Sequence, residues 1–169
     1  MSTKRIFFAL WPDDRQRDHL RDCISPLAKL VDGQVVCRGN WHVTTAFIGS
    51  FPGADISALL ARAAQIPVEP FFLGFDRVEF WPRPKVASLV TSTVPPELQR
   101  LVDAQTALLT DFGVAVEHRT YRPHITVVRR ARPFELQRLA QPAVFEWAGF
   151  ELVESVSQPG GATYHPLKQ

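Results

Sequence analysis

The apolar and polar positions in the first part of the chain follow strand and helix periods in alternation. Residues 5–11 consist of Arg5 followed by an unbroken apolar run, which predicts a buried strand. Pro12 and two aspartates then predict a helix start, because acidic side chains stabilise the positive end of the helix dipole. This helix carries an apolar stripe and a proline that we expect to kink or split it: Leu20, Cys23, Ile24, Leu27 and Val31, with Pro26.

Two more strands and a second helix are expected before Pro67. Residues 34–38 and 42–49 have strand composition and are separated by a Gly-Asn turn. A second helix follows with one apolar stripe, made of Ile56, Leu59, Leu60 and Ala63.

The second half of the chain predicts a strand pair, a long helix and a strand-rich end. A Pro-Arg-Pro turn joins strands at 71–81 and 85–92, and a helix runs from Glu97 to Phe112, entered through two prolines. After residues 114–118 come a strand at 124–130, a short helical piece near 135–139, a strand-rich tail at 145–156, and a hairpin whose last strand holds Tyr164 and Leu167. This order predicts an α/β or α+β domain.

One unit of this order occurs twice. A strand beginning near Ile6 is followed by a helix and then by His42-Val43-Thr44, 36 residues further on. A strand beginning near Val86 is followed by a helix and then by His124-Ile125-Thr126, 38 residues further on. We therefore expect two similarly built lobes, each with one His-x-Thr strand.

Composition limits the class of protein. The 169 residues, 46% of them hydrophobic, suit one domain spanning 1–169 with a core of its own. No secretory signal, membrane span or cysteine spacing typical of a disulfide framework is present in the sequence, so we expect a cytoplasmic protein with no membrane association. The net charge of +2 is small, but five arginines are clustered: Arg119, Arg122, Arg129, Arg130 and Arg132.

The two His-x-Thr strands suit phosphodiester cleavage without a metal. Because side chains alternate along a strand, His42 and Thr44 share one face, as do His124 and Thr126. Of two histidines, one can accept a proton from water while the other donates to the leaving oxygen. Threonine hydroxyls can bind phosphate oxygens, and an arginine can offset the developing charge.

Two alternative interpretations of the histidines are a structural role and a metal site. A single histidine at a strand start is more often structural than catalytic, but two motifs at equivalent places of a repeated unit make coincidence a poor explanation. A metal site needs a third ligand, and neither strand carries an Asp or Glu on the same face as its histidine. We therefore expect no metal and no cofactor.

The segments "HVTTAFIG", "HITVVR", "RIFFAL" and "YHPLK" resemble the two-histidine (2H) phosphoesterases. The most similar branch is the RNA 2′,3′-cyclic phosphodiesterases, also called 2′-5′ RNA ligase-like proteins. The resemblance implies a bilobal α+β fold, with two antiparallel-rich sheets lining a central cleft, helices outside, and a pseudo-twofold repeat. It also implies opening of a 2′,3′-cyclic phosphate on RNA, or on small cyclic nucleotides, to leave a 2′-phosphate.

The resemblance implies a role for each site residue. His42 would donate a proton to the departing 3′ oxygen, and His124 would activate water. Thr44 and Thr126 would hold the phosphate, with Arg129 at the family's basic position. Strict alternation instead places Arg130 on the face of His124, and a bulge or strand end near Val128 would restore Arg129.

Two further points concern Thr45 and the aromatic residues. The family usually has a large aliphatic residue where Thr45 stands, so this hydroxyl should face the core and need a hydrogen-bond partner. Five aromatics could stack on an RNA base, with Tyr121 and Trp81 favoured because each lies beside proline and arginine in an expected loop: Phe8, Trp41, Phe47, Trp81 and Tyr121.

The residues leave two other functions open. One is reversible 2′-5′ RNA ligation, or cleavage of a 2′-5′ linkage, at the same site. The other is a non-catalytic module that binds RNA ends, although a binder has no need of two proton-transfer groups. No obligatory protein partner is expected, and a domain of this size can be a monomer.

Overall fold

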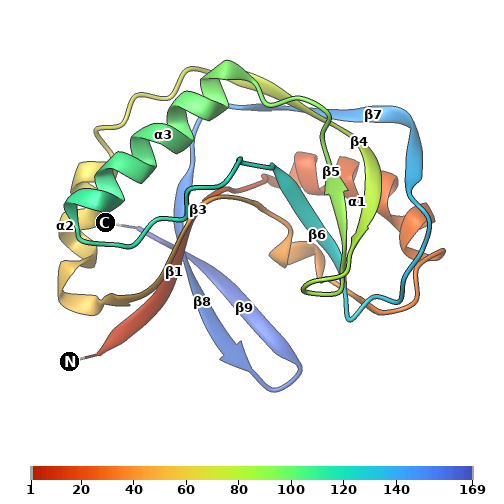
Figure 1. Cartoon of the computed structure of the whole chain (residues 1–169), viewed down its shortest axis with the longest axis horizontal. Helices are drawn as coiled ribbons and strands as arrows, with labels where there is room; N and C mark the ends of the chain where they lie inside the picture. The colour runs from red at the N-terminus through yellow and green to blue at the C-terminus, as the bar shows by residue number, and fades with distance from the viewer. Residues whose placement is uncertain (1, 169) are drawn as a thin grey trace.

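The protein, in a computed structural model that describes residues 2–168, consists of two antiparallel sheets flanked by helices (Figure 1). Sheet A has the order β3-β1-β8-β9, and sheet B the order β2-β6-β5-β4-β7. The expected α+β class with two antiparallel sheets is confirmed. Sheet A consists of β1 (Thr3–Leu10), β3 (Val43–Pro52), β8 (Glu151–Gln158) and β9 (Gly161–Leu167). Sheet B consists of β2 (Gln34–Val35), β4 (Phe71–Trp81), β5 (Val86–Val90), β6 (His124–Arg129) and β7 (Gln137–Trp147).

The helices lie close to their expected positions. They are α1 (Asp14–Ala28), α2 (Ile56–Ala63) and α3 (Pro96–Asp111), with short 3-10 turns at Arg38–Asn40 and Gly53–Asp55. Asp13 caps α1: its carboxylate accepts from the Gln16 backbone, and the Gln16 side chain accepts from the Asp13 backbone, both at 2.8 Å. Pro26 lies in the last turn of α1 and does not split it.

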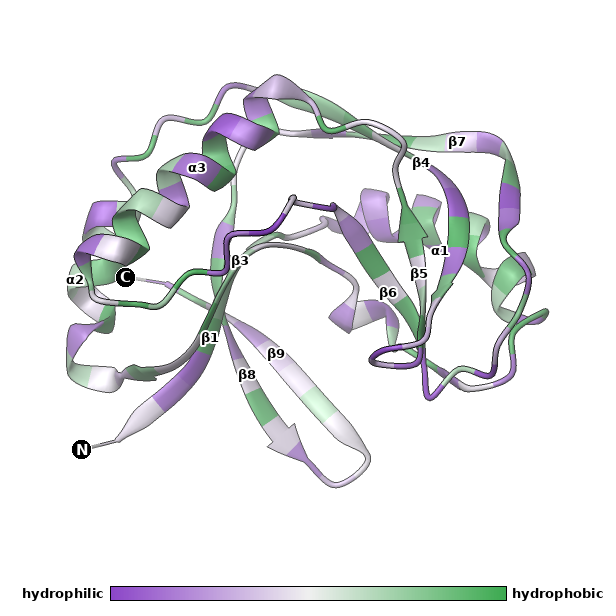
Figure 2. Ribbon diagram, viewed as in Figure 1, coloured by the Kyte–Doolittle hydropathy of each residue, from purple (hydrophilic) through white to green (hydrophobic). Residues whose placement is uncertain are grey.

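The two long helices each pack on the sheet of the other repeat unit. α1 lies between β1 and β3 in the sequence but packs against β6 and β7 of sheet B, where Leu20 joins Ile125 in the larger core. α3 lies between β5 and β6 but packs against β3 of sheet A, where Leu109 joins Ile6 in the smaller core. Figure 2 shows the mixed hydropathy of α3 and the largely hydrophobic β5. These crossings tie the two units together.

Two expectations about local structure are corrected, and a third is refined. The helical piece near 135–139 is wrong: β7 begins at Gln137 and pairs with β4, because pairing with a neighbouring strand outweighs the helix propensity of this short polar segment. The strand at 34–38 is only Gln34–Val35, followed by the 3-10 turn. The tail at 145–156 is strand-rich as expected, and its strands, the end of β7 and most of β8, belong to different sheets.

Both His-x-Thr strands contain a β-bulge directly after the threonine. On β3, Thr44 pairs with Ala9 and Ala46 pairs with Phe8, so Thr45 is the extra residue. On β6, Thr126 pairs with Ser88 and Val128 with Ala87, so Val127 is the extra residue. The repeat therefore extends to the irregularities of the two strands.

The bulges change which residues share a face. Thr45 is buried as expected, but its hydroxyl has no hydrogen-bond partner among residues 2–168. On β6, Val127 and Val128 are both buried and Arg129 is exposed again. The bulge thus returns Arg129, rather than Arg130, to the face of His124 and Thr126.

Candidate active site

The two motif histidines are anchored in the same way. His42 Nδ1 lies 2.7 Å from the carbonyl oxygen of Asn40, and His124 Nδ1 lies 2.8 Å from that of Arg122, in each case two residues earlier in the chain. A carbonyl can only accept a hydrogen bond, so Nδ1 is the protonated nitrogen in both rings. The other nitrogen, Nε2, therefore remains free in each ring to exchange a proton with a substrate.

Aromatic rings hold both imidazoles. His42 lies against Phe7 and Tyr164, with ring centroids 4.9 Å away in both cases, and stacks on Trp11 at 6.0 Å. His124 lies 4.4 Å from Trp81. Each imidazole is thus fixed by packing as well as by its hydrogen bond, which is the preorganisation that proton transfer requires.

This packing changes the acidity of both histidines. Burial lowers the pKa of His42 from 6.5 to about 4, and the charges of His124, Arg129 and Arg17 act in the same direction against the raising effect of the Asn40 carbonyl. The pKa of His124 is also lowered, first by burial and then by the charges of Arg122 and Arg119, against the raising effect of the Arg122 carbonyl. Both imidazoles are therefore neutral at pH 7 in the protein without a bound anion.

The two threonines and Arg129 complete a set of groups suited to a phosphate. Thr44 and Thr126 are half-buried, and neither hydroxyl has a hydrogen-bond partner within residues 2–168. Arg129, from sheet B, donates to the Tyr164 hydroxyl of sheet A at 3.1 Å, and its charge acts on His42. The site therefore combines two proton-exchanging nitrogens, two free hydroxyls and one cation from both sheets.

Tyr121 contacts the first His-x-Thr strand and helps to position it. Its hydroxyl donates to the backbone oxygen of Thr44 at 2.9 Å, and its half-buried ring packs against the larger core. Burial raises the pKa of the Tyr121 hydroxyl, so it remains a donor. This bond joins the segment leading into β6 to the His-x-Thr strand of the other unit.

Glu79 organises the surroundings of His124. Its carboxylate accepts from Trp81 Nε1 at 3.1 Å and from Arg122 at 3.0 Å, while Arg77 donates to it at 2.9 Å. Burial alone would raise the pKa of Glu79, but the hydrogen bonds from Trp81, Arg77 and Arg122 outweigh it and lower the pKa. Trp81 and Arg122 both contact His124, so Glu79 acts on the histidine through them.

Arg17 plays the corresponding part for His42. It is buried at 6% exposure, and its guanidinium donates to the carbonyl oxygens of Arg38 and Trp41, the latter at 3.1 Å. It also lies over the ring of Trp11 at 5.0 Å. The buried guanidinium of Arg17 therefore fixes the turn whose Asn40 carbonyl accepts the hydrogen bond from His42.

The other aromatic candidates are divided between core and surface. Phe8 and Trp41 are buried in the cores and cannot stack on an RNA base, whereas Phe47 is 54% exposed on β3. Sequence reasoning missed Tyr164, Trp11, Arg17 and Glu79. Only Tyr164 had a signal, because it lies in the family-like segment "YHPLK".

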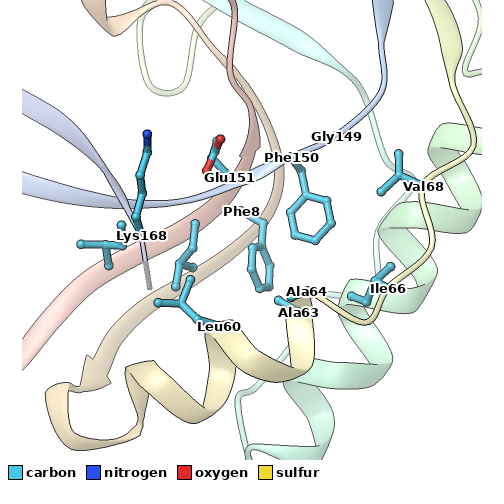
Figure 3. A pocket seen from close by; sticks show the side chains of 12 residues that line it. Phe8, Leu60, Ala63, Ala64, Ile66, Val68, Gly149, Phe150, Glu151 and Lys168 are labelled. Atoms are coloured by element: carbon cyan, nitrogen blue, oxygen red, sulfur yellow. The ribbon is translucent and has the colours of Figure 1, made fainter.

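Arg130 and a cavity beside α2 lie outside this site. Arg130 follows β6, is exposed, and has a left-handed backbone with φ of 49°. A cavity of about 430 Å³ between α2 and β8 is lined by Phe8, Leu60 and Phe150, with neither histidine among its lining residues (Figure 3). Its lining includes Glu151 and Lys168 but none of the histidines and threonines of the two motifs, so the cavity is separate from their site.

Residues 2–168 contain neither a metal-binding cluster nor a membrane-spanning helix. No cluster of three or more His, Cys, Asp or Glu side chains is placed to hold a metal ion there. None of the helices in that range has the length and apolarity to cross a membrane.

Comparisons with known proteins show the family of the chain. The family described as LigT like Phosphoesterase matches residues 10–90. The RNA 2′,3′-cyclic phosphodiesterase of Escherichia coli is 30% identical, covering 98% of this chain and 95% of its own. The protein of the same name from Archaeoglobus fulgidus is 25% identical, covering 97% and 98%. The crystal structure of E. coli LigT complexed with 3′-AMP has a TM-score of 0.87 at 27% identity, covering 99% of this chain and 97% of that one. The chain therefore belongs to the LigT-like phosphoesterases, the two-histidine family that its paired motifs resemble.

Proposed function

We propose that this protein hydrolyses 2′,3′-cyclic phosphate ends of RNA to 2′-phosphates by acid–base catalysis between His42 and His124. The observation that carries this proposal is the equivalent anchoring of the two imidazoles, each with Nδ1 on a carbonyl and a threonine two residues later. The two relatives named RNA 2′,3′-cyclic phosphodiesterase, matched over nearly their whole length, support the same reaction.

The reaction divides between the two histidines. His124 Nε2 accepts a proton from water as the water oxygen bonds to phosphorus. His42 Nε2 donates a proton to the 3′ oxygen as the bond from phosphorus to that oxygen breaks. The product is a 2′-phosphomonoester with a free 3′ hydroxyl, and the two histidines exchange their protonation states.

The remaining groups stabilise the charge on phosphorus. Thr44 and Thr126 donate hydrogen bonds to the non-bridging oxygens, and Arg129 offsets the negative charge that grows on them in the transition state. The bound phosphodiester anion also raises the pKa of His42, because an adjacent negative charge favours the imidazolium form. Substrate binding thereby allows His42 to take up from solvent the proton that the unliganded imidazole lacks at neutral pH.

Substitution of each histidine tests the proposal. Adenosine 2′,3′-cyclic phosphate is incubated with protein in EDTA, and we expect kcat of His42→Ala and of His124→Ala to fall by about 10²–10⁴-fold. His19→Ala is the matched control, since this histidine is exposed on α1. Circular dichroism checks that each variant is folded. A folded His42→Ala or His124→Ala protein with wild-type kcat would refute the assignment.

A further inference from the structure

A hollow of about 370 Å³ adjoins the histidine site at the edge of the two sheets. It lies between the end of β6 in sheet B and the β8–β9 turn of sheet A, and Gln34, Arg129, Arg130, Gly160 and Gly161 are among its lining residues. Gln34 Nε2 donates to the Gly160 carbonyl at 3.2 Å, which holds the turn against sheet B. The volume is in the range of small-molecule sites, about 300–1,000 Å³.

Arg129 connects this hollow to the reacting groups. It lines the hollow, it donates to Tyr164, and its charge acts on His42. Tyr164 in turn lies against the His42 ring. A ligand that occupies the histidine site and extends past Arg129 therefore enters the hollow directly.

The surroundings of the hollow are basic and not neutralised. Lys85 and Arg130 are brought together by the pairing of Val86 with Arg129 and by a 2.9 Å hydrogen bond from the Ala131 amide to the Lys85 carbonyl. Within residues 2–168, five cations of this region make no ion pair with a carboxylate: Arg83, Lys85, Arg129, Arg130 and Arg132. By contrast, Arg62, Arg100 and Arg122 elsewhere are each paired. Unpaired arginines beside a hollow suit an anion.

Backbone conformation distinguishes two of these cations. Lys85 and Arg130 have φ of 65° and 49°, and they are the non-glycine residues with positive φ in the described chain. This conformation costs an L-residue on the order of 1–2 kcal/mol, and such strain concentrates at functional sites. Glycine or asparagine would relieve it, so the presence of long cationic side chains there requires another reason.

We propose that this hollow binds the phosphate that links the terminal nucleotide of the RNA to its 5′ neighbour. The inference rests on the proposed function, because a chain ending in a 2′,3′-cyclic phosphate continues only in the 5′ direction. With the cyclic phosphate between the two histidines, the next phosphate is the nearest anionic group of the substrate. Arg130 binds it from sheet B, and Arg129 lies between the two phosphates.

The proposal makes the protein selective for oligonucleotides over mononucleotides. kcat/KM is measured for adenosine 2′,3′-cyclic phosphate and for the dinucleotide ApA ending in the same cyclic phosphate. We expect the wild-type protein to favour the dinucleotide by about tenfold, the value of one charge-assisted contact. The logarithm of this ratio should fall with the logarithm of salt concentration with a slope of about −0.7, as for one neutralised phosphate of a single strand.

Two changes should remove the preference. Arg130→Asn deletes the charge with a residue that tolerates the left-handed backbone, and it should bring the ratio close to one. A dinucleotide whose linkage is an uncharged methylphosphonate should behave as the mononucleotide does with the wild-type protein. Arg100→Ala, which removes an exposed arginine of α3, is the matched control and should keep the wild-type ratio.

The outcomes separate this proposal from the proposed function. A wild-type ratio near one, or a preference that survives both Arg130→Asn and the methylphosphonate, overturns the phosphate subsite while leaving cyclic phosphate hydrolysis intact. Absence of turnover of both substrates by the wild-type protein overturns the proposed function itself.

Discussion

Titration of His42 offers a quantitative test of the site. An imidazole with a pKa of about 4 instead of 6.5 is disfavoured in its charged form by about 3 kcal/mol, since each pKa unit corresponds to about 1.4 kcal/mol. Burial against Phe7, Trp11 and Tyr164 is the largest cause, and Arg129 adds to it. Removing that cation in Arg129→Gln should therefore raise the pKa of His42 without restoring 6.5.

The same shift makes stability depend on pH. Because the folded-state pKa of His42 lies below the unfolded value, the unfolded chain takes up this proton first as the pH falls. The contribution of His42 is therefore fully present above about pH 6.5, and up to about 3 kcal/mol of it is lost between pH 6.5 and 4.

NMR of the imidazole carbon-bound protons across pH 3–8 measures this pKa in the wild-type protein, with the His42 resonance assigned by its loss in His42→Ala. Addition of a 2′-phosphorylated nucleotide should raise the pKa of His42. A pKa at or above 6.5 in the unliganded protein, or no response to the nucleotide, would refute the electrostatic account.

Three further outcomes are expected. The pH profile of kcat/KM, which reports the free protein, should have its optimum below pH 6.5. The optimum of the kcat profile, which reports the protein with bound substrate, should lie at a higher pH. Coincident optima near pH 7 would contradict the lowered pKa values of His42 and His124. Tyr121→Phe should lower the free energy of unfolding by about 1–2 kcal/mol in urea denaturation, because the Thr44 carbonyl loses its donor; a raised KM at unchanged stability would instead favour base stacking. Glu79→Gln should lower kcat about tenfold with little change in KM. It should also lower the pKa of His124 measured by NMR, because the Arg122 charge is no longer paired with the Glu79 carboxylate. An unchanged kcat would limit Glu79 to a role in folding.

The sequence predicts the paired histidines as the candidate site but not their surroundings. Two His-x-Thr motifs at equivalent places in a repeated unit single out His42 and His124, because strand alternation and acid–base chemistry are local properties. Strand alternation alone could not favour Arg129 over Arg130, because the bulge at Val127 shifts the later residues of β6 to the opposite face of the strand. The amino-acid composition of β6 does not indicate this bulge. The bulge is visible only through the pairing of β6 with β5.

Long-range pairing accounts for what the sequence did not predict. Tyr164 reaches His42 because β9 pairs with β8 and β8 with β1, an order that no local pattern encodes. Arg17 looks like a polar residue on a helix surface until α1 packs beside the Trp41 segment and buries it. The segment 135–139 has helix-forming residues, yet its end becomes β7 because β4 offers a partner strand.

Phosphorus NMR of the reaction products tests the central claim most directly. The wild-type protein is incubated in EDTA with the ApA dinucleotide that ends in a 2′,3′-cyclic phosphate. The acid–base mechanism with His42 as donor to the 3′ oxygen predicts a single new resonance, that of the 2′-phosphomonoester. A 3′-phosphomonoester, a mixture of both isomers, or an unchanged cyclic phosphate would contradict it.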